Sequence, residues 1–123
     1  MSDKEVKIEE RIENEIIIGA YDNDEKFSRW YNYLFENLTF PFYAIYQVSL
    51  EESKNVNVIN ITEYDLCYDE KTVMVEATNK NEIISIPLMQ IKNPEADEKT
   101  LEAMEDLQYW LTMGNNFDDE EFI

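Results

Sequence analysis

Hydrophobic residues recur at helical spacing near the start of the chain. Ile8, Ile12 and Ile16 lie four positions apart and form one apolar stripe. This stripe predicts a helix over residues 5–18, which Gly19 ends because glycine readily adopts the left-handed backbone that follows a helix.

A second helix is predicted to begin at Asp22 or Asp24 and to end before Pro41. Asp22 and Glu25 have the spacing of a capping box, in which the two side chains satisfy free N–H groups of the first turn. The apolar stripe of this helix is unusually aromatic and consists of Phe27, Trp30, Tyr31, Leu34 and Leu38. Such a stripe is typical of a helix that packs on a core.

The middle of the chain is rich in β-branched and aromatic residues, which favour strands. The predicted strands cover residues 42–49, 56–62, 72–77 and 83–88. Residues 78–81 read as a hairpin turn, and Pro87 should lie at a strand end or edge because it has no N–H to donate. Connections this short favour antiparallel pairing.

Helical spacing returns over residues 97–113, with Asn93 and Pro94 as an alternative start of that helix. Its buried stripe comprises Leu101, Met104, Leu107 and Leu111. Residues 1–123 are therefore expected to form one α+β domain: two N-terminal helices, a small four-stranded antiparallel sheet that could close like a barrel, and one C-terminal helix. Residues 115–123 are predicted to be a flexible acidic tail.

The chain combines a strongly negative net charge with a high hydrophobic content. The 123 residues include 28 Asp and Glu against 10 Lys and Arg, for a net charge of −18, yet 44% of the chain is hydrophobic. A disordered acidic segment would lack that apolar content, so the acids belong to a folded surface whose self-repulsion destabilises it. A cation is therefore the first ligand to consider.

Composition also excludes several classes of function. The chain has no histidine, which rules out histidine-based catalysis and histidine zinc sites, and its single cysteine, Cys67, fits a reducing cytoplasm. No apolar run approaches the ~20 residues of a membrane span. The acidic balance disfavours nucleic acid. We therefore expect a cytoplasmic protein that is not an enzyme and binds neither membrane nor nucleic acid.

Calcium suits such a chain because it takes carboxylate, carbonyl and water oxygens as ligands. The EF-hand is excluded as the geometry, however. Counting from Asp22, the sixth position is Phe27 instead of glycine and the twelfth is Tyr33 instead of glutamate. Any calcium site is therefore expected to be assembled by the fold from separate acids.

Glu36 and Asn37 form the first candidate site. They stand at the predicted C-terminal end of the second helix, where a carboxylate is locally unfavourable and free backbone carbonyls could join it around a cation. A solvated surface is the alternative interpretation of this pair.

Two further acidic groups could contribute ligands near Glu36. The first contains Asp22, Asp24 and Glu25, for which helix capping is the simpler explanation. The second contains Glu105 and Asp106, beside Glu98 and Glu102 on the last helix. Like charges four residues apart repel, and a divalent cation would relieve that repulsion, although a solvated helix face is the better explanation for most of these acids.

Several motifs together resemble a known family. They are Arg11-Ile12, Glu15 to Ile18, Ala20-Tyr21, Trp30-Tyr31, Tyr33-Leu34, Phe40-Pro41-Phe42, Ile86-Pro87-Leu88, Asp97, Thr100, Glu105-Asp106 and Tyr109-Trp110. In this order they are similar to the small prokaryotic calcium-binding proteins of the CcbP type, over residues 11–117. The resemblance implies a soluble calcium buffer or sensor that binds calcium ions at acidic surface sites other than EF-hands.

The chain departs from that family pattern at two informative places. Gly19 stands where the family tends to have aspartate, and Asn37 stands in place of an acid after the Tyr33-Leu34 motif. Asn37 can still supply a carbonyl ligand, but with lower charge. The alternative to calcium binding is a non-catalytic acidic interaction protein that docks on a basic partner or mimics nucleic acid.

Overall fold

The structure, a computed structural model, describes residues 2–118. Its elements in chain order are α1 (Asp3–Arg11), the π-helical segment η1 (Ile12–Ile16), α2 (Asn23–Asn37), β1 (Phe42–Gln47), β2 (Ser53–Ile61), α3 (Tyr64–Glu70), β3 (Met74–Asn79), β4 (Glu82–Pro87), the 3-10 segment η2 (Leu88–Gln90), β5 (Ile91–Glu95) and α4 (Glu98–Thr112). The α+β class is as predicted.

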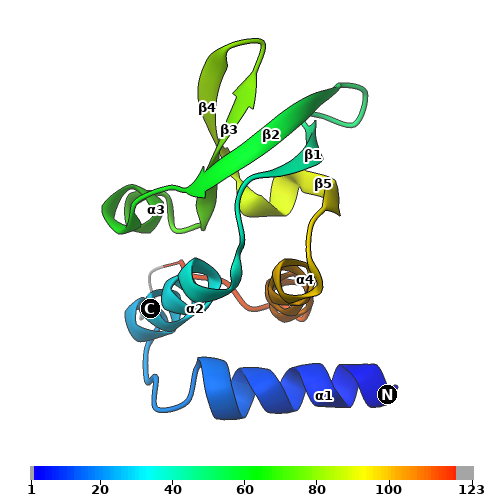
Figure 1. Cartoon of the computed structure of the whole chain (residues 1–123). Coiled ribbons are helices and arrows are strands. Elements are labelled where there is room, and N and C mark those ends of the chain that lie inside the picture. The colour runs from blue at the N-terminus through cyan, green and yellow to red at the C-terminus, as the bar shows by residue number, and fades with distance from the viewer. Residues whose placement is uncertain (1, 119–123) are drawn as a thin grey trace.

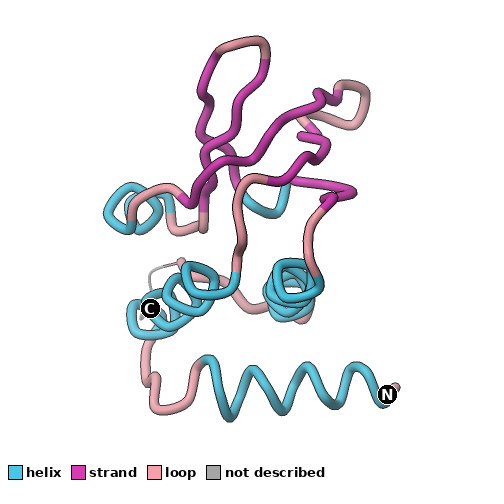
Figure 2. Tube along the Cα trace, viewed as in Figure 1, coloured by secondary structure: helices cyan, strands magenta, loops and turns pink. Residues whose placement is uncertain are grey.

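Three layers are stacked in this fold. In Figure 1, α2 and α4 lie side by side beneath the sheet, and α1 crosses them on the side away from it. The same separation of strands from long helices is clear in Figure 2. Thr39, just after α2, donates its N–H to Thr100 at the start of α4, whereas Phe27 near the start of α2 packs on Phe117 after α4. The two helices are therefore antiparallel.

The sheet has five antiparallel strands in the order β4-β3-β2-β1-β5, so the predicted four-stranded sheet is wrong. It is open, with β4 and β5 at its edges, and does not close into a barrel. Strand β5 was not predicted; it contains Pro94 and pairs with β1 in an irregular register. A proline and a bulge are tolerated at a sheet edge, where one side of the strand needs no partner.

The hairpin turn between β3 and β4 is confirmed. Lys80 and Asn81 both have positive φ, of 49° and 71°, as the tight two-residue hairpin turn requires. Asn93 also has positive φ, within β5, so the suggested helix start at Asn93 and Pro94 is wrong. Helix α4 begins instead after its N-cap, Asp97.

Two helical segments differ from the predictions. The first helix is regular only to Arg11, and the N–H of Ile17 donates to the carbonyl of Ile12 five residues earlier, which makes the next turn a π-helix. Helix α3 was not predicted. Among its seven residues only Cys67 is buried, and no side chain caps its start, so it lacks both an apolar stripe and a start signal.

One face of the sheet packs on the helices and the other is open. Ala44 pairs with Val56 and both are buried, whereas Tyr43 pairs with Asn57 on the opposite face. The buried face meets Trp30 and Leu34 of α2 in a continuous core. Within residues 2–118, no helix is long and apolar enough to cross a membrane.

The C-terminal segment begins in contact with the domain. Phe117 is buried against Phe27 and Trp110, and the side-chain amide of Asn23 donates to the carbonyl of Asp118 at 2.7 Å. Residues 115–118 of the expected tail therefore lie along α2 and α4. Residues 119–123, which hold the remaining tail acids, lie outside the described residues.

Candidate functional site

The first acidic group lies at the N-terminal end of α2, and each of its members has a protein partner. Asp22 is the N-cap and accepts from the N–H of Glu25 at 2.8 Å. Glu25 accepts from the N–H of Tyr21, and Asp24 accepts from the hydroxyl of Tyr68 at 2.9 Å. The predicted capping role of Asp22 is confirmed. All three residues are exposed, and the second oxygen of each carboxylate has no hydrogen bond to a described residue.

Asp106 of the second group is a buried structural carboxylate. Its side chain is fully buried and accepts two hydrogen bonds from Arg11, of 2.8 Å from Nε and 2.6 Å from Nη2. The hydroxyl of Tyr33 donates to the same carboxylate at 2.8 Å. Burial, followed by the bond to Asp106, raises the pKa of Tyr33 well above its usual value of 10. These contacts join α1, α2 and α4 at one point.

Glu105 faces α1 as well. It forms an ion pair of 2.7 Å with Lys4, and Glu102 lies 3.7 Å from Arg11. A hollow between the two helices is lined on the α1 side by Lys4, Lys7 and Arg11 and on the α4 side by Glu98, Glu102 and Glu105. The acidic stripe of α4 therefore already has three internal cations beside it, which offset part of its repulsion.

Glu36 and Asn37 lie at the other end of α2, where they end the helix as predicted. The side-chain amide of Asn37 donates to the carbonyl of Tyr33 at 2.7 Å, which leaves its Oδ1 atom as an unused acceptor. Glu36 is exposed, and it has neither a hydrogen bond nor an ion pair with any residue that the structure describes.

Backbone carbonyls near Glu36 also lack their usual helical donors. The N–H of Thr39 would normally bond the carbonyl of Phe35, but it donates to Thr100 at 2.9 Å. The carbonyl of Asn37 would normally take the N–H of residue 41, which is a proline and has none. The end of α2 therefore presents a carboxylate, an amide oxygen and carbonyl oxygens together. Pro41 was the sequence signal for this helix end, whereas no sequence pattern linked Thr39 to Thr100.

The acids at the start of α2 lie too far from Glu36 to bind the same ion. Asp22 and Glu36 stand at opposite ends of a 15-residue helix, roughly 20 Å apart at 1.5 Å per residue. They cannot ligate one ion. Within residues 2–118, no three acidic or cysteine side chains come together closely enough to hold a metal ion by themselves. A calcium ion here would need amide, carbonyl or water oxygens in addition.

Comparisons with known proteins show the family to which the chain belongs. The CcbP family profile, described as calcium binding, matches residues 10–111. The crystal structure of Anabaena CcbP is similar with a TM-score of 0.78 and 32% identity, over 90% of this chain and 92% of that one. A calcium binding protein in the calcium-binding form is similar with a TM-score of 0.81 and 32% identity, over 93% of this chain and 98% of that one.

A comparison with curated proteins gives no match. The profile match covers most of the chain, and the two structures extend it to the whole fold. The chain belongs to the CcbP-type family of calcium-binding proteins.

Proposed function

We propose that this protein binds calcium ions reversibly at the C-terminal end of α2, by a site that is not an EF-hand. The observation that carries the proposal is the set of unused oxygen atoms at that helix end: the Glu36 carboxylate, Asn37 Oδ1 and the carbonyls of Phe35 and Asn37. Calcium accepts all three oxygen types. The family supplies the choice of cation.

The hydrogen bond between Tyr33 and Asp106 supports a further contributor from α4. It fixes the register of two antiparallel helices. Asn37 lies one turn after Tyr33 in α2, and Glu102 lies one turn before Asp106 in α4. Because the helices are antiparallel, we expect Asn37 and Glu102 to face each other between α2 and α4. The side chain of Glu102 is 57% exposed and can turn towards an ion. In this proposal Glu105 and Asp106 act beside the site by holding α1 in place.

The acids at the start of α2 are proposed as a second and weaker site. Asp22, Asp24 and Glu25 are exposed, and each uses only one carboxylate oxygen in a hydrogen bond within the protein. Capping already stabilises these charges, so an ion would gain less by binding there than at Glu36, which has no such partner.

Calcium binding at either end of α2 would reduce the repulsion of a protein with a net charge of −18. Binding to the folded state alone would also raise its stability in proportion to calcium concentration. We therefore propose a cytoplasmic, non-catalytic role as a calcium buffer or sensor.

Calorimetric titration of metal-free protein in excess magnesium tests this function. We expect calcium to release or absorb heat with saturation, and to raise the melting temperature, because magnesium demands a stricter octahedral geometry than a helix end provides. Absence of both a calcium heat and a stability increase would show that the chain does not bind calcium.

A further inference from the structure

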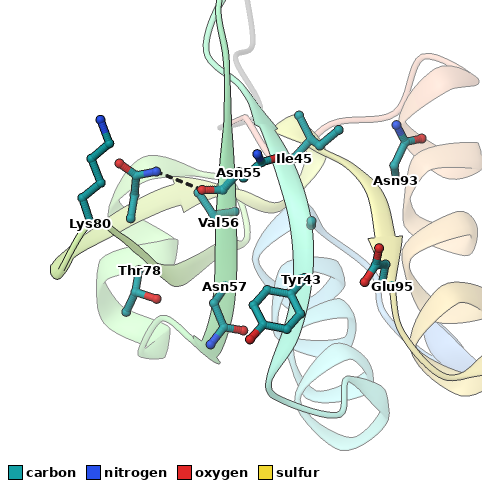
Figure 3. A pocket seen from close by; sticks show the side chains of 11 residues that line it. Tyr43, Ile45, Asn55, Val56, Asn57, Thr78, Lys80, Asn93 and Glu95 are labelled. Atoms are coloured by element: carbon teal, nitrogen blue, oxygen red, sulfur yellow. Dashed lines mark hydrogen bonds between the residues drawn. The ribbon is translucent and has the colours of Figure 1, made fainter.

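The open face of the sheet contains a hollow far from the acids discussed above. Its volume is about 510 Å³, and it spans β1, β2, β5 and the β3–β4 turn. Figure 3 shows the labelled side chains standing over the strands, with the helices behind them. The hollow is therefore on the sheet face that no helix covers.

The chemistry of this face differs from that of the rest of the protein. The five strands contain three acids, Glu76, Glu82 and Glu95, and two lysines, Lys54 and Lys92, so their net charge is −1 (2 − 3) in a chain of −18. The polar lining of the hollow is dominated by four neutral amides, Asn55, Asn57, Asn79 and Asn93. A surface of this kind favours an uncharged polar ligand over an ion.

Asn57, which lines the hollow, has a side-chain oxygen that accepts no hydrogen bond from a described residue. This Oδ1 atom is buried. Asn57 pairs with Tyr43 on one side and Thr78 on the other, both of which line the hollow. The Asn57 side chain therefore has hydrogen-bonding capacity that no described residue uses.

Tyr43 gives the hollow an aromatic wall. Its side chain is 65% exposed although β1 is an inner strand of the sheet, and Figure 3 shows its ring beside Asn57. A tyrosine ring offers a flat apolar surface together with a hydroxyl. The amides around it can each donate and accept hydrogen bonds. Together they match a ligand that has apolar C–H faces and many hydroxyl groups.

The size of the hollow favours a ligand longer than a single sugar ring. Its two charged residues are Lys80, which directly follows β3 in the β3–β4 turn, and Glu95 on β5. Strands β3 and β5 are three positions apart in the sheet, or roughly 14 Å at the usual strand spacing. A small zwitterion cannot contact both charges over that distance. A peptide would instead pair with a sheet edge, where free backbone groups are available.

We propose that the open sheet face binds a neutral oligosaccharide, with Tyr43 stacking on a sugar ring and the surrounding asparagine amides forming hydrogen bonds with its hydroxyl groups. The site is separate from the end of α2 and uses none of the proposed calcium ligands. Binding is therefore expected with and without calcium, so failure of one proposal leaves the other standing.

The test is a two-dimensional NMR titration of the ¹⁵N-labelled full chain with the neutral trisaccharides maltotriose, cellotriose, mannotriose and triacetylchitotriose. We expect at least one of them to shift amide signals of β1, β2 and β5 in a saturable way. Tyr43→Ala should weaken that binding about tenfold or more. Tyr21→Ala, which removes an aromatic side chain that is 89% exposed elsewhere, should leave it unchanged.

Three results would overturn the proposal. They are no saturable shift with any of the four sugars, shifts confined to the helices, and equal binding by the wild-type chain and the Tyr43→Ala variant. The spectra themselves report whether Tyr43→Ala is folded. If that variant does not fold, Asn57→Ala replaces it, and loss of the same sugar-induced shifts is again the expected result.

Discussion

Arg11 donates two hydrogen bonds to Asp106, whose side chain is fully buried, and thereby attaches α1 to α4. Asp106, which was predicted as a possible calcium ligand, is thus bound by an arginine of the same chain. Tyr33 donates to the same carboxylate, so the helices α1, α2 and α4 share this single buried charge.

Substituting Arg11→Met should lower the free energy of unfolding by about 3 kcal/mol, because it leaves the Asp106 carboxylate buried without its counter-ion. Urea unfolding of the calcium-free protein measures this loss. Arg29→Met makes the same change at an exposed arginine and should have an effect within about 0.5 kcal/mol. The double variant Arg11→Met/Asp106→Leu should recover part of the loss, and failure to recover any would contradict this role of the pair.

Substituting Glu36→Gln should weaken calcium binding about tenfold or more, because it removes the one carboxylate at the end of α2. Calorimetric titration gives the dissociation constant. Glu70→Gln on α3 makes the same change of charge at another exposed acid. Equal losses for the two variants would mean that calcium senses only the net charge of the protein.

Asn37→Asp should have the opposite effect and tighten calcium binding about tenfold, because it adds a charged ligand at the same position. It also removes the amide donor to Tyr33 and places a second negative charge at a helix C-terminus. The calcium-free variant should therefore be less stable than the wild type by about 0.5 kcal/mol. Weaker calcium binding by this variant would argue against Asn37 as a ligand.

Asp97 makes stability depend on acid pH. Hydrogen bonds from Thr100, first from its side chain and then from its N–H, hold the pKa of Asp97 below its ordinary value of 3.8. Because the folded pKa is depressed, this stabilisation is present above the unfolded pKa and disappears as pH falls through the folded one. Asp97→Ala should therefore melt lower than wild type at pH 6, and the gap should narrow as the pH falls below 3.8. A gap that is constant with pH would contradict this linkage.

The sequence allowed most of the core elements to be predicted, because their patterns were local. The aromatic stripe of α2 and the capping residue Asp22 are periodic or adjacent signals, and both describe the structure. Strand β5 was not predicted because asparagine and proline, here Asn93 and Pro94, are rare in strands. The strand forms because it pairs with β1. Helix α3 is short and exposes most of its residues.

The candidate site was predictable only in part for the same reason. Pro41 marked the helix end that carries Glu36 and Asn37. The partners of Asp106 come from residues 95 and 73 positions away, and no sequence pattern links Arg11 or Tyr33 to it. Long-range pairing thus decided which acids are used inside the protein and which stay available to an ion.

The central claim is that calcium binds at the C-terminal end of α2, and anomalous diffraction from a crystal grown with calcium tests it most directly. We predict an anomalous peak within about 2.3–2.6 Å of a Glu36 carboxylate oxygen, with Asn37 Oδ1 in the same coordination shell. Peaks found only at other acids, with Glu36 and Asn37 facing solvent, would contradict the claim.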